Sequence, residues 1–393
     1  MSKKNHLFSP EDERFRQQVR DWLEASKPRT PRPSDAQGQR EYDLGWQRTQ
    51  YEGGWAGIAW PKEYGGLGLP LIRQLIWYEE YARAEAPHVG ASMVGLNHGG
   101  PTLIVRASDE QKAFHLPKIL KGEVVWSQGF SEPGSGSDLA SLRTKGRVED
   151  GHLVVNGQKI WTSYAHISDY QELLVRTDPD SSRHRGLTWI ICDMKLPGIT
   201  IRPIRNMVGD HHFNEVFYDN VRIPLANVVG QIGEGWSVAM STLGFERGTA
   251  HARDQIELSL ELEKLIAYAK VHPGPDGVRP AIKDDEFAGR LAMLRAEMSA
   301  LRSLVYTMVS RIEKTGSPGP EGSIVRLYFA ETKQRMTRLA ADLLGVAAIE
   351  RHRVEGLSAL DYLNSLRFTI SAGTAEIQRN IIGERILGLP RGK

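Results

Sequence analysis

The sequence predicts an α+β protein that is mostly α, in which a strand-rich segment separates two helical ones. Apolar residues recur at helical spacing before about residue 124 and again after about residue 235. Between these limits, short strand-like runs alternate with turn dipeptides, which is typical of a compact β module. We therefore expect three domains: an N-terminal helical domain at 1–124, a middle β domain at 125–234 and a C-terminal helical bundle at 235–393.

The first helical segment contains a clear start signal at Ser9-Pro10, where a serine cap precedes proline and two acids. The stretch Lys27–Arg40 is rich in proline and arginine, and we expect a surface loop there. Further helices are predicted at about 71–86 and 109–121. These elements make the N-terminal domain helical throughout.

The middle segment, from about Val124 to Gly235, contains the strand signals. Asp150-Gly151 and Asn156-Gly157 are both dipeptides that favour hairpin turns, and an apolar run lies between them. Three more runs are expected to be strands, at residues 173–176, 187–191 and 214–218. Helices return after Gly235, with a proline- and glycine-rich loop at 272–280 and long helical runs at 286–314, 322–347 and 375–386.

Composition excludes several classes of protein. The 393 residues include 50 basic and 48 acidic side chains, and this near balance argues against nucleic acid as the main partner. The single cysteine, Cys192, forbids an intrachain disulfide and thiolate-rich metal sites, and no metal is expected. No window holds the roughly 20 apolar residues needed to span a bilayer. We expect a cytoplasmic protein without membrane contact.

Two neighbouring motifs carry the chemical signal. A strand at Trp126 runs into the loop Ser131–Asp138, whose small residues would let a ligand approach the backbone and would offer hydroxyls and N–H donors. The run Gln158–Ser163 then supplies a tryptophan and two hydroxyls. A plain turn is the better explanation of a lone Gly/Ser loop, but the second motif favours a ligand site.

With these motifs, the chain resembles the acyl-CoA dehydrogenase family. The matching segments, in family order, are Trp60–Gly66, Asp109–Lys112, Ser131–Asp138, Asn156–Ser163 and Gly373–Asn380. They extend over essentially the whole chain. The resemblance implies the family fold: an N-terminal helical domain, a middle β-barrel-like domain and a C-terminal four-helix bundle. It also implies FAD as the cofactor.

The resemblance further implies which residues form the site. Those expected to bind FAD are Gln128, Phe130, Ser131, Trp161, Thr162, Ser163, Thr374 and Glu376. The Ser163 hydroxyl would lie within reach of flavin N5, and Ser137 and Arg247 would contact the acyl-CoA substrate. The expected reaction is α,β-dehydrogenation of the thioester to the trans-2-enoyl-CoA, in which a carboxylate removes the α proton and the flavin accepts the β hydride.

The base requires separate consideration. Many relatives place a glutamate two residues before the threonine of the Gly373-Thr374 pair, but here that position is Ala372. Isovaleryl- and long-chain-type relatives place it just before an arginine on the helix that follows the β domain. Glu246, which precedes Arg247, is therefore our candidate base. A surface glutamate is the alternative, although the residues three and four positions away are not cationic.

Several functional alternatives stay open at this point. By resemblance, electrons would pass to an electron-transferring flavoprotein, and the chain would form a homo-oligomer, a dimer or a tetramer. The segments 270–277 and 342–346 depart from the family pattern that completes the neighbouring subunit's FAD site. The chain could therefore be a partial-site or non-catalytic subunit of a hetero-oligomer, or an oxidase of the same fold. These departures and the pair Gly244 and Gly248 favour a bulky or branched acyl group such as a sterol side chain. Arg183-His184-Arg185 is either an exposed turn or a clamp for CoA phosphates.

Overall fold

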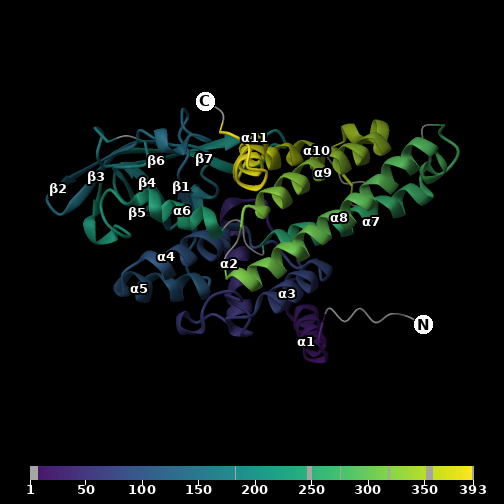
Figure 1. Ribbon diagram of the computed structural model, residues 1–393, viewed down its shortest axis with the longest axis horizontal. Helices are drawn as coiled ribbons and strands as arrows, with labels where there is room; N and C mark the ends of the chain where they lie inside the picture. Colours follow the sequence, from purple (N-terminus) through teal and green to yellow (C-terminus); the bar gives the residue numbers. More distant parts are fainter. Residues whose placement is uncertain are drawn as a thin grey trace. The chain divides into compact units, whose positions relative to one another are not determined.

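The computed structural model describes residues 8–181, 183–245, 250–274, 276–316, 319–350 and 357–391 (Figure 1). These residues fall into two compact units, each assembled from separate stretches of chain. The helical unit comprises residues 1–24, 71–86 and 247–393, and the sheet unit comprises residues 25–70 and 87–246. The three domain limits expected from the sequence stay a prediction.

The helical unit is built around three long helices that run alongside one another (Figure 1). Its helices are α1 (Pro10–Ser26), α3 (Leu71–Arg83), α7 (Ala250–Val271), α8 (Asp285–Thr315), α9 (Glu321–Leu344), α10 (Ala359–Ser365) and α11 (Ala375–Ile381), the last continued by a π-helical turn at Ile382–Ile386. One apolar core joins α3, α7, α8 and α9 through the buried side chains of Leu75, Leu258, Leu301 and Phe329. The helices expected at 286–314 and 322–347 are thus confirmed within a few residues.

The sheet unit contains a curled seven-stranded mixed sheet, which confirms the predicted β module. Its strands are β1 (Trp126–Gly129), β2 (Lys145–Glu149), β3 (His152–Lys159), β4 (Tyr170–Arg176), β5 (Leu187–Asp193), β6 (Ile199–Arg205) and β7 (His211–Pro224). They follow the order β1-β4-β2-β3-β7-β6, with β5 paired to β4. The pairs β1–β4 and β2–β4 are parallel, and the others are antiparallel.

Four helices complete the sheet unit: α2 (Ala36–Glu52), α4 (Gly100–Arg106), α5 (Asp109–Leu120) and α6 (Gly235–Phe245). Helix α5 starts at a capping box, in which the Ser108 hydroxyl accepts from Gln111 N while the Gln111 side chain accepts from Ser108 N. Helices α4, α5 and α6 share a core with the sheet, in which Leu103, Trp126 and Trp189 are fully buried. Buried Cys192 lies on β5, and burial raises the pKa of its thiol.

Two local predictions were wrong. The expected loop Lys27–Arg40 ends early, because Asp35 caps α2 by accepting a hydrogen bond of 2.8 Å from Gly38 N. Asn156-Gly157 forms no hairpin turn but a bulge inside β3, opposite β7. A β-carbon at Gly157 would come within 2.6 Å of Thr144 Oγ1, so glycine is needed there for close packing rather than for a turn. The hairpin at Asp150-Gly151 is confirmed between β2 and β3.

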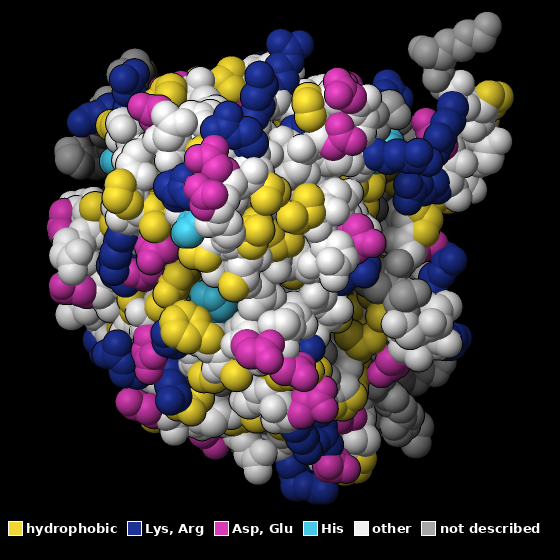
Figure 2. All heavy atoms as spheres, turned by 90° about the vertical axis from the view of Figure 1, so that its left-hand side faces the viewer, with side chains coloured by type: hydrophobic (Ala, Val, Ile, Leu, Met, Phe, Trp, Pro, Cys, Tyr) yellow, Lys and Arg dark blue, Asp and Glu magenta, His cyan; other side chains and the backbone are white. Residues whose placement is uncertain are grey.

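The surface of the sheet unit carries mixed charges. Figure 2 views the face that includes β2 and β3, and basic and acidic side chains alternate across it without a large area of one sign. This distribution agrees with the near-neutral composition of the chain. Within the ranges that the structure describes, no helix is long and apolar enough to cross a membrane.

Buried His115 on α5 makes the sheet unit sensitive to acid. Its ring lies edge-on to Trp126 and Tyr170, with ring centroids 5.2 and 4.9 Å apart. Burial, with a smaller contribution from the charge of Lys118, lowers the pKa of His115 to about 4. The unfolded chain takes up this proton below about pH 6.5, whereas the folded chain does so only near pH 4, so stability falls as the pH drops through this window.

We therefore expect His115→Phe to flatten the loss of stability in acid. At about 1.4 kcal/mol per pKa unit, the native histidine accounts for about 3 kcal/mol of stability lost between pH 7 and pH 4. Urea unfolding at pH 7 and pH 4.5, followed by tryptophan fluorescence, measures the difference. Some acid sensitivity should remain, because burial and the neighbouring His211 also lower the pKa of His166 to about 4. Equal pH slopes in the variant and the native protein would contradict the prediction.

Candidate functional site

The structure brings the two sequence motifs into direct contact within the sheet unit. The first motif follows β1, and the second follows β3. Ile160 N donates a hydrogen bond of 2.9 Å to the carbonyl of Ser131, which ties the end of one motif to the other. Phe130 is buried in the core beside Trp126, so the residues around it are held on a rigid base. Gln128, Phe130, Ser131, Trp161, Thr162 and Ser163 thus belong to one region.

A buried ion pair fixes the Gly/Ser-rich loop. Lys159, fully buried at the end of β3, donates to Glu132 Oε1 and to the carbonyl of Phe130, both at 2.9 Å. Glu132 also accepts from the backbone N–H groups of Arg143 at 2.6 Å and Thr144 at 2.8 Å. One carboxylate therefore joins the two ends of the loop that contains Ser137.

The charges of this pair compensate each other. Burial lowers the pKa of Lys159 to about 8, although the adjacent Glu132 carboxylate opposes the shift. Burial acts to raise the pKa of Glu132, but the charge of Lys159 and the hydrogen bonds from Thr144 and Arg143 outweigh it, so the pKa is lowered. Both groups are therefore ionised at neutral pH, and the loop is held by charge-assisted bonds.

A second buried carboxylate lies behind β1. Gln128 Nε2 donates to Glu172 Oε1 at 2.7 Å, and His98 Nδ1 lies 3.7 Å from the same oxygen. Glu172 has no exposed surface, and it faces Gln128 because β1 and β4 pair in parallel register. Sequence reasoning missed both Glu172 and His98, since they lie outside the two motifs. Together they fix the amide of Gln128.

The second motif adopts an unusual backbone. Trp161 and Tyr164 have φ angles of 60° and 58°, in the left-handed region that non-glycine residues seldom occupy. The Trp161 side chain is 56% exposed, so it is not a core aromatic residue, and its ring meets Phe213 edge-on at 6.0 Å. Left-handed residues of this kind cost about 1–3 kcal/mol each and cluster at ligand sites.

Buried Asn214 holds that backbone in place. Its main chain exchanges two hydrogen bonds with Thr162, of 3.0 and 3.1 Å, and its side-chain amide donates a third bond of 3.0 Å to Thr162 O. Its Oδ1 lies 2.8 Å from His211 Nε2. Sequence reasoning placed Asn214 only at the start of a strand. A fully buried asparagine is the signal that indicates its role, and burial is visible only in the structure.

The donors and acceptors of this region fit a flavin. Thr162 Oγ1 is buried and has no hydrogen-bond partner among the described residues, which favours a partner supplied by a ligand. The half-buried Ser131 and Ser163 contribute two more hydroxyls to the same two motifs. The exposed Trp161 ring offers a flat apolar surface. Hydroxyls that converge beside an aromatic ring are suited to the polar edge and the planar face of a flavin ring.

The remaining predicted residues are not all in this region. Ser137 is exposed on the Gly/Ser-rich loop between Glu132 and Arg143, which is the pinned loop of the sheet unit. Thr374 and Glu376 belong to the helical unit, where the Thr374 hydroxyl caps α11 by accepting from Ile377 N at 3.3 Å and Glu376 is exposed. Ala372 is also exposed, in the left-handed region with a φ of 54°. Glu246 and Arg247 lie outside the described residues.

The family models match nearly the whole chain. The acyl-CoA dehydrogenase N-terminal domain matches residues 9–123, the middle domain residues 127–221 and the C-terminal domain residues 233–387. Acyl-CoA dehydrogenase IpdE1 of Mycobacterium tuberculosis is 36% identical to this chain, over 96% of this chain and 98% of its own length.

Solved structures agree with these matches. A structure named Tcur3481-Tcur3483 steroid ACAD superimposes with a TM-score of 0.85 at 29% identity, over 98% of this chain and 99% of its own chain. The ChsE4-ChsE5 complex from Mycobacterium tuberculosis gives a TM-score of 0.83 at 31% identity, over 98% and 99%. The fold and the site thus define a flavin-dependent oxidoreductase. The chain belongs to the acyl-CoA dehydrogenase family, its cofactor is FAD, and it is an enzyme of that class.

Proposed function

We propose that this protein converts an acyl-CoA thioester to its trans-2-enoyl-CoA, with Glu246 as the base that removes the α proton. Bound FAD supplies the acceptor for the β hydrogen, which leaves as hydride. The exposed Trp161 ring beside the buried, unpartnered Thr162 hydroxyl is the observation that carries the proposal. These residues, with Gln128, Phe130, Ser131 and Ser163, would bind and orient the flavin, and Thr374 and Glu376 would contribute from the helical unit.

The proposed base needs help from its surroundings, because an α C–H bond is only weakly acidic. Hydrogen bonds to the thioester carbonyl and the exclusion of water would make the α proton easier to remove. A carboxylate base in a site closed to water has its pKa raised toward neutrality, which matches it to this task. Ser137 and Arg247 would bind the substrate. In the sheet unit, the pinned loop and Asn214 hold Ser137 and Thr162 before any ligand arrives.

We propose a bulky acyl group, such as one derived from a steroid, as the substrate. Around Gly244, near the end of α6, no described atom beyond its chain neighbours and its own helix backbone lies within 4 Å of the place that a β-carbon would occupy. Gly244 precedes Glu246 by two residues. One of the similar structures is named a steroid ACAD, which favours the same substrate class. The experiment is anaerobic titration of the flavoprotein with a panel of acyl-CoAs, in which steroid-derived thioesters should bleach the flavin absorbance fastest. Faster turnover of short straight-chain acyl-CoAs would refute this choice of substrate.

The oligomeric state is a separate proposal. One of the similar structures is named the ChsE4-ChsE5 complex, and another carries the double name Tcur3481-Tcur3483. The segments 270–277 and 342–346 of this chain also depart from the family pattern. We therefore propose that its FAD site is completed by a second, different chain. Purification alone and with the candidate partner distinguishes the cases: full flavin content in the isolated chain would show that no second, different chain completes the site. Electrons would pass to an electron-transferring flavoprotein, whereas rapid reoxidation by air would indicate an oxidase.

A further inference from the structure

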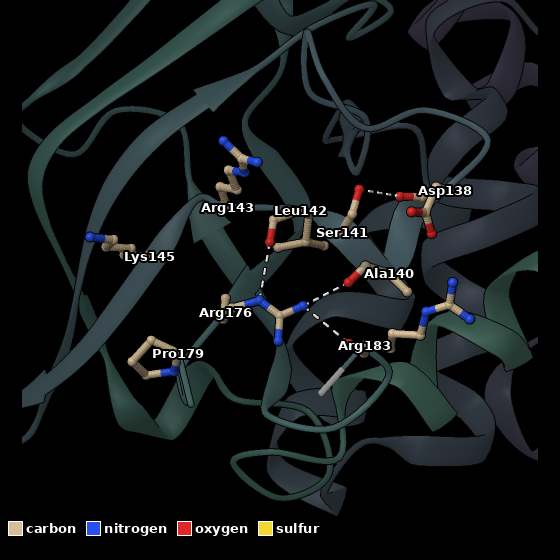
Figure 3. A pocket seen from close by; sticks show the side chains of 9 residues that line it. All are labelled: Asp138, Ala140, Ser141, Leu142, Arg143, Lys145, Arg176, Pro179 and Arg183. Atoms are coloured by element: carbon tan, nitrogen blue, oxygen red, sulfur yellow. Dashed lines mark hydrogen bonds between the residues drawn. The ribbon is translucent and has the colours of Figure 1, made fainter. Parts of the chain in front are cut away.

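A cationic pocket of 430 Å³ opens on the sheet unit, directly after Ser137 in the chain (Figure 3). Its volume lies in the range of small-molecule sites. It is lined by residues from the pinned loop, the start of β2, the end of β4 and the β4–β5 loop: Asp138, Ala140, Ser141, Leu142, Arg143, Lys145, Arg176, Pro179 and Arg183. Four of the nine side chains are cationic and one is anionic, so the pocket has a clear excess of positive charge.

Arg176 builds the pocket and is not free to bind a ligand. It lies at the centre of Figure 3, and its guanidinium donates to four carbonyls: Ala140 O at 2.7 Å, Arg183 O at 3.0 Å, Leu142 O at 3.1 Å and Arg185 O at 3.2 Å. These carbonyls come from the loop before β2 and the loop after β4. One side chain thus joins the two loops and fixes the shape of the pocket before a ligand arrives.

The other three cations of the pocket have no anionic partner among the residues that the structure describes. Arg143, Lys145 and Arg183 are exposed, and none of them forms an ion pair with a described residue. Arg143 and Lys145 flank buried Thr144, so the alternation of extended backbone turns both side chains to the same face. Asp138, the one carboxylate of the pocket, lies on the side of Arg183 in Figure 3 without an ion pair between them. In Figure 3, Lys145 and Arg183 lie on opposite sides of Arg176, with Arg143 above it. A bound anion would supply these exposed cations with the counter-charge that no described residue provides.

We propose that this pocket binds the phosphorylated nucleotide end of the CoA thioester, with Lys145 and Arg183 as the main phosphate contacts and Arg143 beside them. The inference rests on the proposed function, because it takes a CoA thioester as the substrate. Phosphate groups carry up to two negative charges and accept several hydrogen bonds, and Lys and Arg are their usual partners. The pocket also begins at the residue after Ser137, which the family pattern assigns to the substrate.

The test measures binding of free CoA to the flavoprotein by calorimetry, so that no turnover is needed. The double variant Lys145→Gln/Arg183→Gln should bind CoA at least about tenfold more weakly, since each lost charge-assisted contact is worth about that factor. Its affinity should also depend less on salt concentration. Arg205→Gln on β6 is the matched control, because Arg205 is an exposed arginine of the same unit without an ion pair among the described residues. Its affinity should match that of the native protein.

Two further ligands show whether the nucleotide end of CoA or its pantetheine end accounts for the loss of affinity. Adenosine 3′,5′-bisphosphate should compete with CoA on the native protein and lose most of its affinity on the double variant, whereas pantetheine, which lacks the nucleotide, should bind both proteins equally. Unchanged CoA binding in the double variant would overturn the proposal, as would an equal loss for pantetheine or a loss for inorganic phosphate alone. If no acyl-CoA bleaches the flavin but the CoA pattern holds, the proposed function fails while this pocket assignment stands.

Discussion

Glu246→Gln is expected to lower the rate of flavin reduction by acyl-CoA by about 10²–10⁴-fold, the usual contribution of a general base. Glutamine has nearly the same size and shape as glutamate, but its amide cannot take up the α proton. Binding of the substrate and the flavin should therefore remain close to native. Stopped-flow reduction under anaerobic conditions measures the chemical step directly, and the acyl-CoA dissociation constant of the same variant shows whether binding is preserved.

A matched control variant shows whether the loss of any carboxylate near α6 lowers the rate of flavin reduction. Glu234→Gln removes an exposed carboxylate just before α6 and should leave the reduction rate unchanged. The choice of Glu246 depends on Ala372, because alanine at that position cannot act as a base. Native reduction rates in Glu246→Gln would show that another group removes the proton. Loss of acyl-CoA binding in proportion to the rate would instead place Glu246 in substrate binding.

The sequence predicted the elements of the fold better than their contacts. Helices α1 and α5 were located because helical signals are local, and the start signal at Ser9-Pro10 is an example. The prediction of a hairpin turn at Asn156-Gly157 was wrong because glycine is suited both to a turn and to a place where another strand comes close. Only the position of Thr144 in the structure decides between the two. A pattern within a short stretch of sequence does not show which distant residue comes close to it.

The candidate site shows the same difference between local sequence signals and tertiary contacts. The two motifs were visible in the sequence, and the resemblance supplied the expected roles of their residues. The residues that support them were not visible, because they meet only through tertiary pairing. Glu172 reaches Gln128 across 44 positions of sequence, and Asn214 reaches Thr162 across 52. A buried polar residue in a strand looks like any other polar residue until its burial is known.

Lys159 is the supporting residue whose loss should destabilise the sheet unit most. Lys159→Met keeps most of the apolar stem of the side chain but leaves the Glu132 carboxylate, whose side chain is only 9% exposed, without its counter-charge. Breaking one partner of a buried ion pair costs about 3–5 kcal/mol. The carbonyl of Phe130 would lose its donor as well. We therefore expect a large fall in the free energy of unfolding, together with weaker FAD binding, because the loop and the flavin region share this anchor.

Urea unfolding of the apoprotein and flavin titration measure these two effects separately. In Lys159→Met/Glu132→Gln, much of the lost stability should return, because the neutral amide carries no uncompensated charge and its oxygen can still accept from Arg143 N or Thr144 N. Lys195→Met is the control: its side chain is 77% exposed and 3.4 Å from Asp169, so its removal should cost less than about 1 kcal/mol. If the Lys159 and Lys195 variants were equally stable, the pair would not hold the loop, and the rigid placement of Ser137 and the cationic pocket would need another cause.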